Sequence, residues 1–192
     1  MTDYHSLTKF LFEVGQLNRV KRSGFTLIGV NDTQSVAEHQ ARAAIIAYFL
    51  AKLEKANVEK CLITSLFHDV PETRLNDLHK VGHRYIDFKK AEEEALKEQI
   101  ENLPENTKSE LLDYFISYRK DKTKEGIIVR DADLLENALE AKEYLEKGLK
   151  HAQNWIDNIK KALVTNSAKK ILIEIENSDP YEWWQGLKKA DR

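Results

Sequence analysis

The chain has 192 residues, which is long enough to bury a hydrophobic core without disulfides, and a second full domain is not expected. Its 30 Lys and Arg residues oppose 32 Asp and Glu, so no overall positive charge favours a nucleic acid polymer or a membrane surface as partner. The absence of a long apolar run and the single cysteine, Cys61, predict a cytoplasmic protein without a membrane span.

The distribution of apolar residues predicts an all-α fold. Only 7 Gly and 3 Pro interrupt the chain, and apolar residues recur at spacings of three and four, as in amphipathic helices. We expect residues 1–192 to form one compact helical bundle. The predicted helices cover roughly residues 5–20, 35–55, 57–70, 84–102, 107–119, 124–147, 149–164 and 167–176.

The segment between the first two predicted helices is expected to be a loop, because it contains Gly24 and Gly29. Its apolar residues are expected to pack down as a lid. The next helix begins with Ser35 and, three residues on, Glu38. This is the capping-box pattern, in which both side chains bind exposed backbone amides. It places the start of the helix just before His39.

His39 is predicted to point inward, because it shares one helical face with Ala43, Ile46, Leu50 and Leu53. Most inward histidines only hydrogen-bond a neighbour. By itself the position therefore favours a core histidine over a metal ligand.

Another polar pair ends the almost wholly apolar helix that follows. His68 and Asp69 stand just before Pro71, which prevents regular continuation of the helix. A buried carboxylate needs a cation, strong donors or solvent in a cleft, and a metal ion would satisfy both residues together.

Titratable residues are dense after Pro71. Glu72 and Asp77 follow the His-Asp pair within one short segment, and we interpret them as functional. For His79 and His83 a solvated loop is at least as good an interpretation.

The helix predicted over residues 124–147 contains two candidate acids. Asp131 shares an apolar stripe with Ile127 and Leu134, whereas Asp133 shares a face with Glu136. Periodicity alone favours Asp131 as the inward acid.

Four motifs occur in order along the chain: SVAEH, FHDVPE, LND and VRDADLL. Together they resemble the HD-domain hydrolases, and specifically the compact subgroup that includes 5'-deoxynucleotidases. The resemblance covers roughly residues 10–150, and the ordered set is specific although each motif is weak. The C-terminal helices and aromatic tail, residues 150–192, lie outside it. The resemblance implies a bundle of the HD-domain type.

The resemblance also assigns roles. It implies that His39, His68, Asp69 and Asp133 bind the metal, because the late acid in the family stands between Ala and an apolar residue, as Asp133 does. This overrides the periodicity, and Asp131 becomes the alternative ligand or a neighbour of one.

Glu72 and Asp77 match the family's catalytic acids. Relatives usually have glycine before the second acid, where this chain has Asn76, a residue that tolerates positive φ. Arg22 and Phe25 match an arginine and an aromatic residue that contact phosphate and deoxyribose. Relatives often have Trp at the aromatic position, and Phe25 lacks the indole N–H donor of that residue.

The expected activity is metal-dependent hydrolysis of a deoxynucleoside 5'-monophosphate to deoxynucleoside and phosphate. Histidine and carboxylate ligands suit one divalent ion, and they do not distinguish Mn, Co, Fe, Ni, Zn or Mg. One alternative is another nucleotide substrate, either a cyclic nucleotide, a dNTP or guanosine tetraphosphate. A second is a non-catalytic helical scaffold that keeps an HD-type core.

The C-terminal segment contains Tyr181, Trp183 and Trp184 after Pro180. It could be a docked tail, a dimer contact or a lid over the pocket, and packing in a core or interface is the default expectation. Similar proteins are often homodimers, and we expect the same of this chain.

Overall fold

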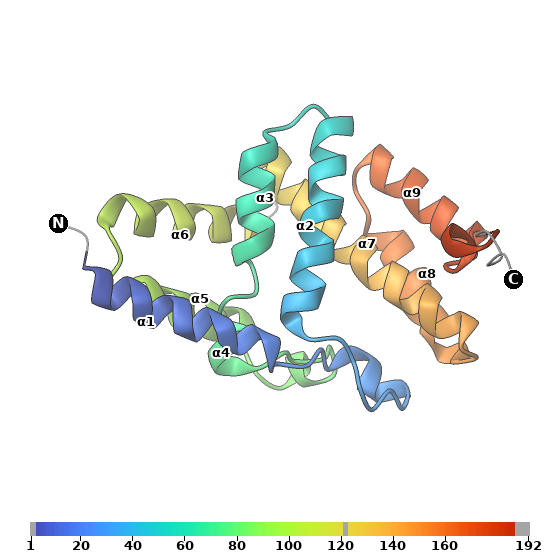
Figure 1. Ribbon diagram of the computed structural model, residues 1–192, viewed down its shortest axis with the longest axis horizontal. Helices are drawn as coiled ribbons and strands as arrows, with labels where there is room; N and C mark the ends of the chain where they lie inside the picture. The colour runs from blue at the N-terminus through green and yellow to red at the C-terminus, as the bar shows by residue number, and fades with distance from the viewer. Residues whose placement is uncertain (1–2, 121–122, 187–192) are drawn as a thin grey trace, which may run out of the picture.

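The computed structural model describes residues 3–120 and 123–186, and every regular element in these ranges is helical (Figure 1). This confirms the predicted all-α fold. The α-helices are α1 (Tyr4–Val14), α2 (Val36–Leu53), α3 (Val58–Phe67), α4 (Glu72–Leu75), α5 (Phe88–Ile100), α6 (Glu105–Lys120), α7 (Lys124–Glu146), α8 (Gln153–Ala162) and α9 (Asn166–Asn177). Short 3-10 helices are η1 (Gly15–Asn18), η2 (Gly24–Ile28), η3 (Gly82–Arg84), η4 (Lys150–Ala152) and η5 (Glu182–Trp184).

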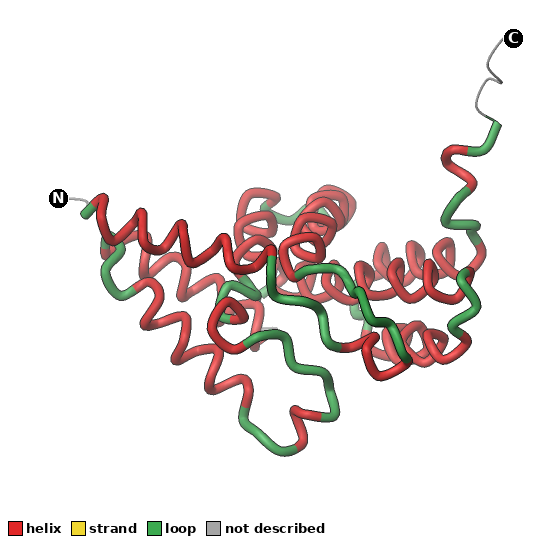
Figure 2. The backbone as a smooth tube through the Cα atoms, turned by 60° about the horizontal axis from the view of Figure 1, so that its bottom comes forward, coloured by secondary structure: helices red, strands yellow, loops and turns green. Residues whose placement is uncertain are grey.

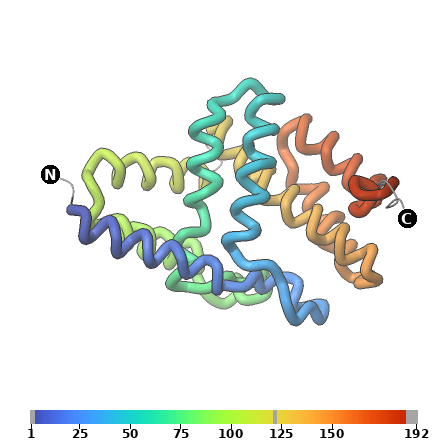
Figure 3. Tube along the Cα trace, viewed as in Figure 1, coloured from blue at the N-terminus to red at the C-terminus, as the bar shows by residue number. Residues whose placement is uncertain are grey.

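The bundle is built around α2, α3 and α7. α2 and α3 run side by side, and both pack against α7 (Figures 1 and 3). α8 and α9 flank α7 on one side of this centre, whereas α1, α5 and α6 lie on the other. None of the described helices is both long and apolar enough to cross a bilayer.

Two hydrophobic clusters form the core. The first joins α2 and α7 to α8 and α9 and includes Ala47 and Cys61. The second lies among α1, α5 and α6 and includes Val36 and Val70. His39 lies between Val36 and Ala47 in the sequence, and His68 between Cys61 and Val70. Both histidines therefore sit where the chain passes from one cluster to the other.

The capping box predicted at the start of α2 is confirmed. The Ser35 hydroxyl accepts a hydrogen bond from the Glu38 amide at 3.2 Å, and the Glu38 carboxylate accepts one from the Ser35 amide at 2.6 Å. The expected inward face is correct for His39 and Leu50, which are fully buried. It is wrong for Leu53, whose residue is 60 % exposed, because α2 ends there and the chain turns away through positive-φ Lys55.

Several helix boundaries differ from the prediction. The first helix ends at Val14 instead of near residue 20, and the chain continues as η1. α5 begins at Phe88, later than predicted, because the Asp87 side chain accepts a hydrogen bond from the Lys90 amide and caps the helix. The expected loop at residues 21–34 contains η2, which places Phe25 in the first hydrophobic cluster.

The aromatic tail does not pack into the core over its described part. Trp183 is 82 % exposed and Trp184 is 47 % exposed, and the chain leaves the bundle beyond α9 (Figure 2). Trp183 and Pro180 line an open groove beside α7 and α9. The end of the tail, Leu187 to Lys189, lies outside the described residues. A dimer contact of this tail stays a prediction.

Candidate metal centre

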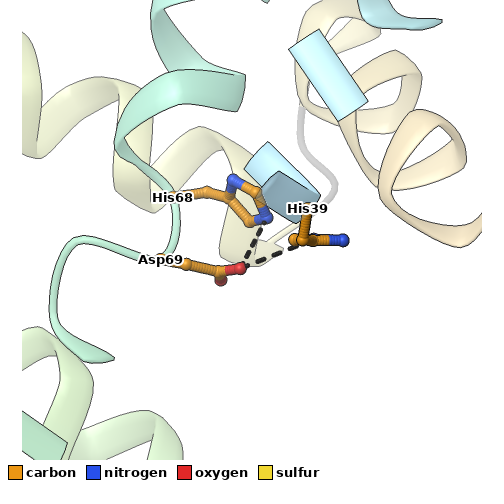
Figure 4. Close-up of side chains that lie close together, drawn as sticks. All are labelled: His39, His68 and Asp69. Carbon is orange, nitrogen blue, oxygen red and sulfur yellow. Dashed lines mark ion pairs between the residues drawn. The ribbon is translucent and has the colours of Figure 1, made fainter. Parts of the chain in front are cut away.

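His39 enters the centre of the molecule from the first turn of α2, and His68 and Asp69 enter from the end of α3 (Figure 4). One potential ligand atom from each lies within 4.8 Å of the other two. Oδ2 of Asp69 is 3.2 Å from Nε2 of His68 and 3.6 Å from Nε2 of His39. The structure therefore brings together three of the four residues that the sequence motifs predicted as metal ligands.

The hydrogen bonds of the two imidazoles leave these atoms facing one another. Nδ1 of His39 contacts the Glu136 carboxylate, and Nδ1 of His68 donates to the Ser65 carbonyl at 2.6 Å. Nε2 of each ring and Oδ2 of Asp69 are buried without a hydrogen-bond partner among the described residues. Because unpartnered buried polar atoms are costly, a divalent cation fits this donor set, and the outer contacts are those of metal-binding histidines.

The two candidate acids of α7 have different surroundings. Oδ1 of Asp133 lies 3.2 Å from Nε2 of His39. The Asp131 carboxylate instead accepts hydrogen bonds from the amides of Val164 and Thr165, at 3.0 and 2.7 Å, where α8 joins α9. Periodicity correctly predicted that Asp131 points inward, since it is fully buried, but its carboxylate is bound at the α8–α9 connection, and Asp133 as the fourth metal ligand stays a prediction. α7 packs against helices on several sides, and an apolar stripe cannot tell these sides apart.

Tyr118 and Asn137 hold Asp133, and the sequence motifs identified neither. The Tyr118 hydroxyl donates to Oδ2 of Asp133 and accepts from Arg130, each at 3.0 Å. The Tyr118 ring also meets His68 edge-on, with the ring centroids 4.9 Å apart. The Asn137 amide donates to Oδ1 of Asp133 at 3.3 Å. These contacts orient the carboxylate toward His39.

Replacing Tyr118 with phenylalanine is expected to weaken the binding of a divalent metal by about ten- to a hundredfold, the usual loss when an outer hydrogen bond to a ligand is removed. Titration calorimetry with Mn²⁺ and Co²⁺ measures this. Tyr114→Phe is the matched control, since Tyr114 lies on the same helix and its hydroxyl donates to exposed Glu110. Equal affinities of the two variants would contradict the orienting role of Tyr118.

The charges of the centre are strongly coupled. Burial opposes ionisation of Asp69 and Asp133, yet His39, His68 and Arg22 hold the pKa of both carboxyl groups below the usual value. Burial and Arg22 oppose protonation of His39, but Asp133 and Glu136 outweigh them and raise its pKa to about 9. The negative charge of the surrounding carboxylates therefore favours a proton on His39, and the same charge would favour a bound cation.

Arg22 and the two predicted catalytic acids lie beside the predicted metal ligands. Nη1 of Arg22 is 3.5 Å from Oδ2 of Asp69 and 3.6 Å from Oδ1 of Asp77. Glu72 is only 4 % exposed, and burial together with Asp69 and Asp77 raises its pKa well above the usual value. Asn76 adopts a φ of +60° and a ψ of 166°, so it has the expected positive φ but lies outside the left-handed helical region that asparagine usually adopts.

The side chains of Arg22, Glu72 and Asp77 line a cavity of about 630 Å³, a volume typical of a small-molecule site. His79 and His83 also line it. Phe25 lines it as well, but it is only 1 % exposed, and its ring stacks on Trp155 with the centroids 4.8 Å apart. A direct contact of Phe25 with a sugar stays a prediction. Trp155, absent from the sequence motifs, shares this wall.

The cavity also contains a buried ion pair, Glu92 with Arg119, that no motif indicated. Burial and Asp69 outweigh the attraction of Arg119 and raise the pKa of Glu92 to about 7. A carboxyl group whose pKa is raised on folding favours the folded state below its unfolded pKa, and loses that contribution as the pH rises to the folded value.

The unfolding free energy of Glu92→Gln is therefore expected to rise relative to that of the wild type as the pH is raised from 4.5 to 8. The rise is at most on the order of 3 kcal/mol. Urea unfolding of both proteins at the two pH values measures the difference. Glu94→Gln, at an exposed position of the same helix, should show little such change. A pH-independent difference for Glu92→Gln would refute the raised pKa.

Comparison with known proteins agrees with this geometry. The family model described as "HD domain" matches residues 14–174. The chain belongs to the HD-domain family. It is 32 % identical over 155 residues to the mouse protein named 5'-deoxynucleotidase HDDC2, covering 79 % of this chain and 77 % of that protein. The predicted family and subgroup are thereby confirmed.

Solved structures show the same fold. A conserved hypothetical protein from Pyrococcus furiosus superposes with a TM-score of 0.75 at 28 % identity, covering 89 % of this chain and 99 % of that one. The cyanophage S-2L HD phosphohydrolase DatZ, whose structure is described as bound to dA and one catalytic Zn²⁺ ion, superposes with a TM-score of 0.58 at 14 % identity over 86 % of this chain and 94 % of that one. At that identity the likeness concerns the fold alone.

Proposed function

We propose that this HD-domain protein is a 5'-deoxynucleotidase, a metal-dependent hydrolase that converts deoxynucleoside 5'-monophosphates to deoxynucleosides and phosphate. The observation that carries the proposal is the convergence of buried ligand atoms of His39, His68 and Asp69, which have no hydrogen-bond partner among the described residues, beside a cavity that Asp69 and Arg22 line. The names of the curated relatives supply the substrate class.

Four residues would hold one divalent ion: His39 and His68 through Nε2, and Asp69 and Asp133 through carboxylate oxygens. A bound ion of this kind acidifies a water molecule and neutralises charge on a phosphoryl oxygen. The donor set suits Mn, Co, Fe, Ni or Zn, with Mg also allowed.

The remaining groups bind the phosphate and handle protons. Arg22 is the cation nearest to the ligand carboxylates, and burial has not removed its charge: Asp77 and Asp69 raise its pKa further. We assign it to the phosphate dianion. Water attacks phosphorus, the bond from phosphorus to the 5'-oxygen breaks, and the leaving oxygen takes a proton. Glu72 is the proton donor in this scheme, because burial, Asp69 and Asp77 raise its pKa and favour its protonated form.

Asp77 is the second acid of the scheme. Its Oδ2 accepts a hydrogen bond from the Ser23 amide, and its Oδ1 faces Arg22. These contacts fix the carboxylate at the cavity, where we assign it to accept a proton from the attacking water. Ser23 follows Arg22 directly, so one short segment positions both the phosphate-binding cation and this acid.

Release of inorganic phosphate tests the function. The four common deoxynucleoside and ribonucleoside 5'-monophosphates are incubated with metal-loaded protein in separate series with Mn²⁺, Co²⁺, Zn²⁺ and Mg²⁺. We expect phosphate from the deoxy series. Cyclic nucleotides, dNTPs and guanosine tetraphosphate run in parallel, with product analysis, so that another substrate class is recognised. Intact metal binding without phosphate release from any monophosphate would refute the proposal.

The proposal further includes a cytoplasmic homodimer. The buried free thiol of Cys61 fits a reducing compartment. Four large apolar side chains form an exposed stripe on α2, which we call the α2 stripe: Ile45, Tyr48, Phe49 and Leu53. Apolar patches of this kind often mark protein contacts, and this one supports an α2-mediated dimer.

Phe49→Asp is expected to raise the dimer dissociation constant by at least about a hundredfold, because it places an unpaired charge in the contact. Light scattering over a range of concentrations after size exclusion measures it. Phe12→Asp is the matched control, at an 80 % exposed position on α1. If Phe12→Asp dissociates the dimer and Phe49→Asp does not, the interface lies on α1 instead. A monomeric wild type would refute the dimer proposal.

A further inference from the structure

The cavity extends beyond the catalytic groups to a wall made by α8. Asn154, Asn158 and Ala162 line it at spacings of four residues, so they share one face of the helix. Trp155 and Ile159 line it beside them. A phosphate group alone would not fill a volume of about 630 Å³. The wall therefore faces the part of a ligand that lies away from the phosphate.

The position of this wall relative to the metal ligands is fixed by α7. Asp133 and Asn137 on α7 line the same cavity, and Asn137 accepts a hydrogen bond from Arg22 at 3.2 Å. α8 packs along α7, and the amides of Val164 and Thr165 after α8 are anchored to Asp131. α8 is therefore a rigid neighbour of the helix that carries the fourth ligand.

The chemistry of the α8 wall differs from that of the catalytic end. α8 contributes no charged side chain to the cavity lining, and its exposed Asn154 and Asn158 amides have no protein hydrogen-bond partner among the described residues. Each amide offers two donor hydrogens and one acceptor oxygen. The indole of Trp155, stacked on Phe25, adds a flat aromatic surface. Such a wall suits a neutral, flat heterocycle with hydrogen-bonding edges.

We propose that the α8 wall is a nucleobase subsite, in which Asn154 and Asn158 hydrogen-bond the edges of the base and Trp155 packs against it. The subsite rests on the proposed function, since it gives that reaction a base preference. Side chains four residues apart on a helix are about 5–6 Å apart at Cβ. A purine presents the N7 acceptor on a second edge in addition to its Watson–Crick edge, so it offers the two amides more hydrogen-bonding atoms than a pyrimidine does. Purine deoxynucleotides are therefore the preferred substrates.

Binding of deoxynucleosides tests the subsite without requiring hydrolysis. In a Trp183→Phe, Trp184→Phe background, Trp155 is the one remaining tryptophan of the three, so its fluorescence reports on this wall. Metal-loaded protein is titrated with deoxyadenosine, deoxyguanosine, deoxycytidine and thymidine. We expect the purine nucleosides to quench Trp155 and to bind more tightly than the pyrimidine nucleosides.

Asn158→Ala and Asn154→Ala are each expected to weaken purine binding by about three- to tenfold, the effect of one neutral hydrogen bond. Gln153→Ala, an amide on α8 whose side chain donates to Asp157, should leave binding unchanged. Hydrolysis of 2-deoxyribose 5-phosphate, which has no base, should be unchanged in Gln153→Ala.

The outcomes separate the two proposals. Equal binding of all four nucleosides, or unchanged purine binding in both asparagine variants, overturns the subsite even where monophosphates are hydrolysed. Selective quenching by purines that depends on Asn158, together with no phosphate release from any monophosphate, supports the subsite and overturns the hydrolytic function. Absence of quenching by every nucleoside overturns the subsite.

Discussion

Asp133→Asn is expected to weaken metal binding by at least about a hundredfold, more than the loss of an outer hydrogen bond costs. It should also lower kcat/KM by on the order of 10³-fold, because the ion supplies several kcal/mol of transition-state stabilisation. The reason is local: Asp133 is the α7 carboxylate that reaches His39, and Tyr118 and Asn137 orient it. Metal content by mass spectrometry and steady-state kinetics measure the two effects.

Asp131→Asn is the matched control, because Asp131 is the neighbouring acid of α7, two residues before Asp133. Asp131 is fully buried and accepts hydrogen bonds from Val164 and Thr165. Its replacement should cost about 2 kcal/mol, the loss of charge-assisted hydrogen bonds. In a chain of this size that lowers the melting temperature by roughly 4–8 °C. Metal content should stay at the wild-type level. The reverse pattern, with metal lost from Asp131→Asn and kept by Asp133→Asn, would exchange the two assignments.

Glu72→Gln is expected to lower kcat by about 10²- to 10⁴-fold while the protein still binds metal, because a positioned proton donor contributes a factor of that size. The side chain is buried and its pKa is raised, which favours its protonated form. Glutamine keeps the shape without the transferable proton. The melting temperature at pH 8 should not fall, since the variant no longer buries a group that resists ionisation.

The pH profile distinguishes a proton donor from a merely structural residue. A donor must be protonated, so wild-type activity falls as the pH rises through the raised pKa of Glu72. The residual activity of Glu72→Gln should lack this alkaline limb. Glu98→Gln, at a largely exposed position that pairs with Arg74, should keep both kcat and the limb. An unchanged limb in Glu72→Gln would assign the proton to another group.

Much of the fold was predictable because local physics decides it. The spacing of apolar residues predicted an all-α chain, and Ser35 with Glu38 predicted the start of α2. Asn76 was expected to tolerate positive φ, and it has a φ of +60°. Helix ends were predicted less well, as α1 and α5 show, because the capping contacts of neighbouring residues shift them by several positions.

The sequence by itself determined the family, the helical class and the positions of His39, His68 and Asp69, because helix caps, burial and Pro71 act through neighbours in the chain. Only the tertiary structure decided where the two acids of α7 go. A buried helix has several apolar neighbours, so its periodicity indicates that Asp131 points inward but not which neighbour it meets, and it does not indicate that Asp133 reaches His39. The partners themselves, Tyr118 for Asp133 and the α8–α9 connection for Asp131, come from distant parts of the chain.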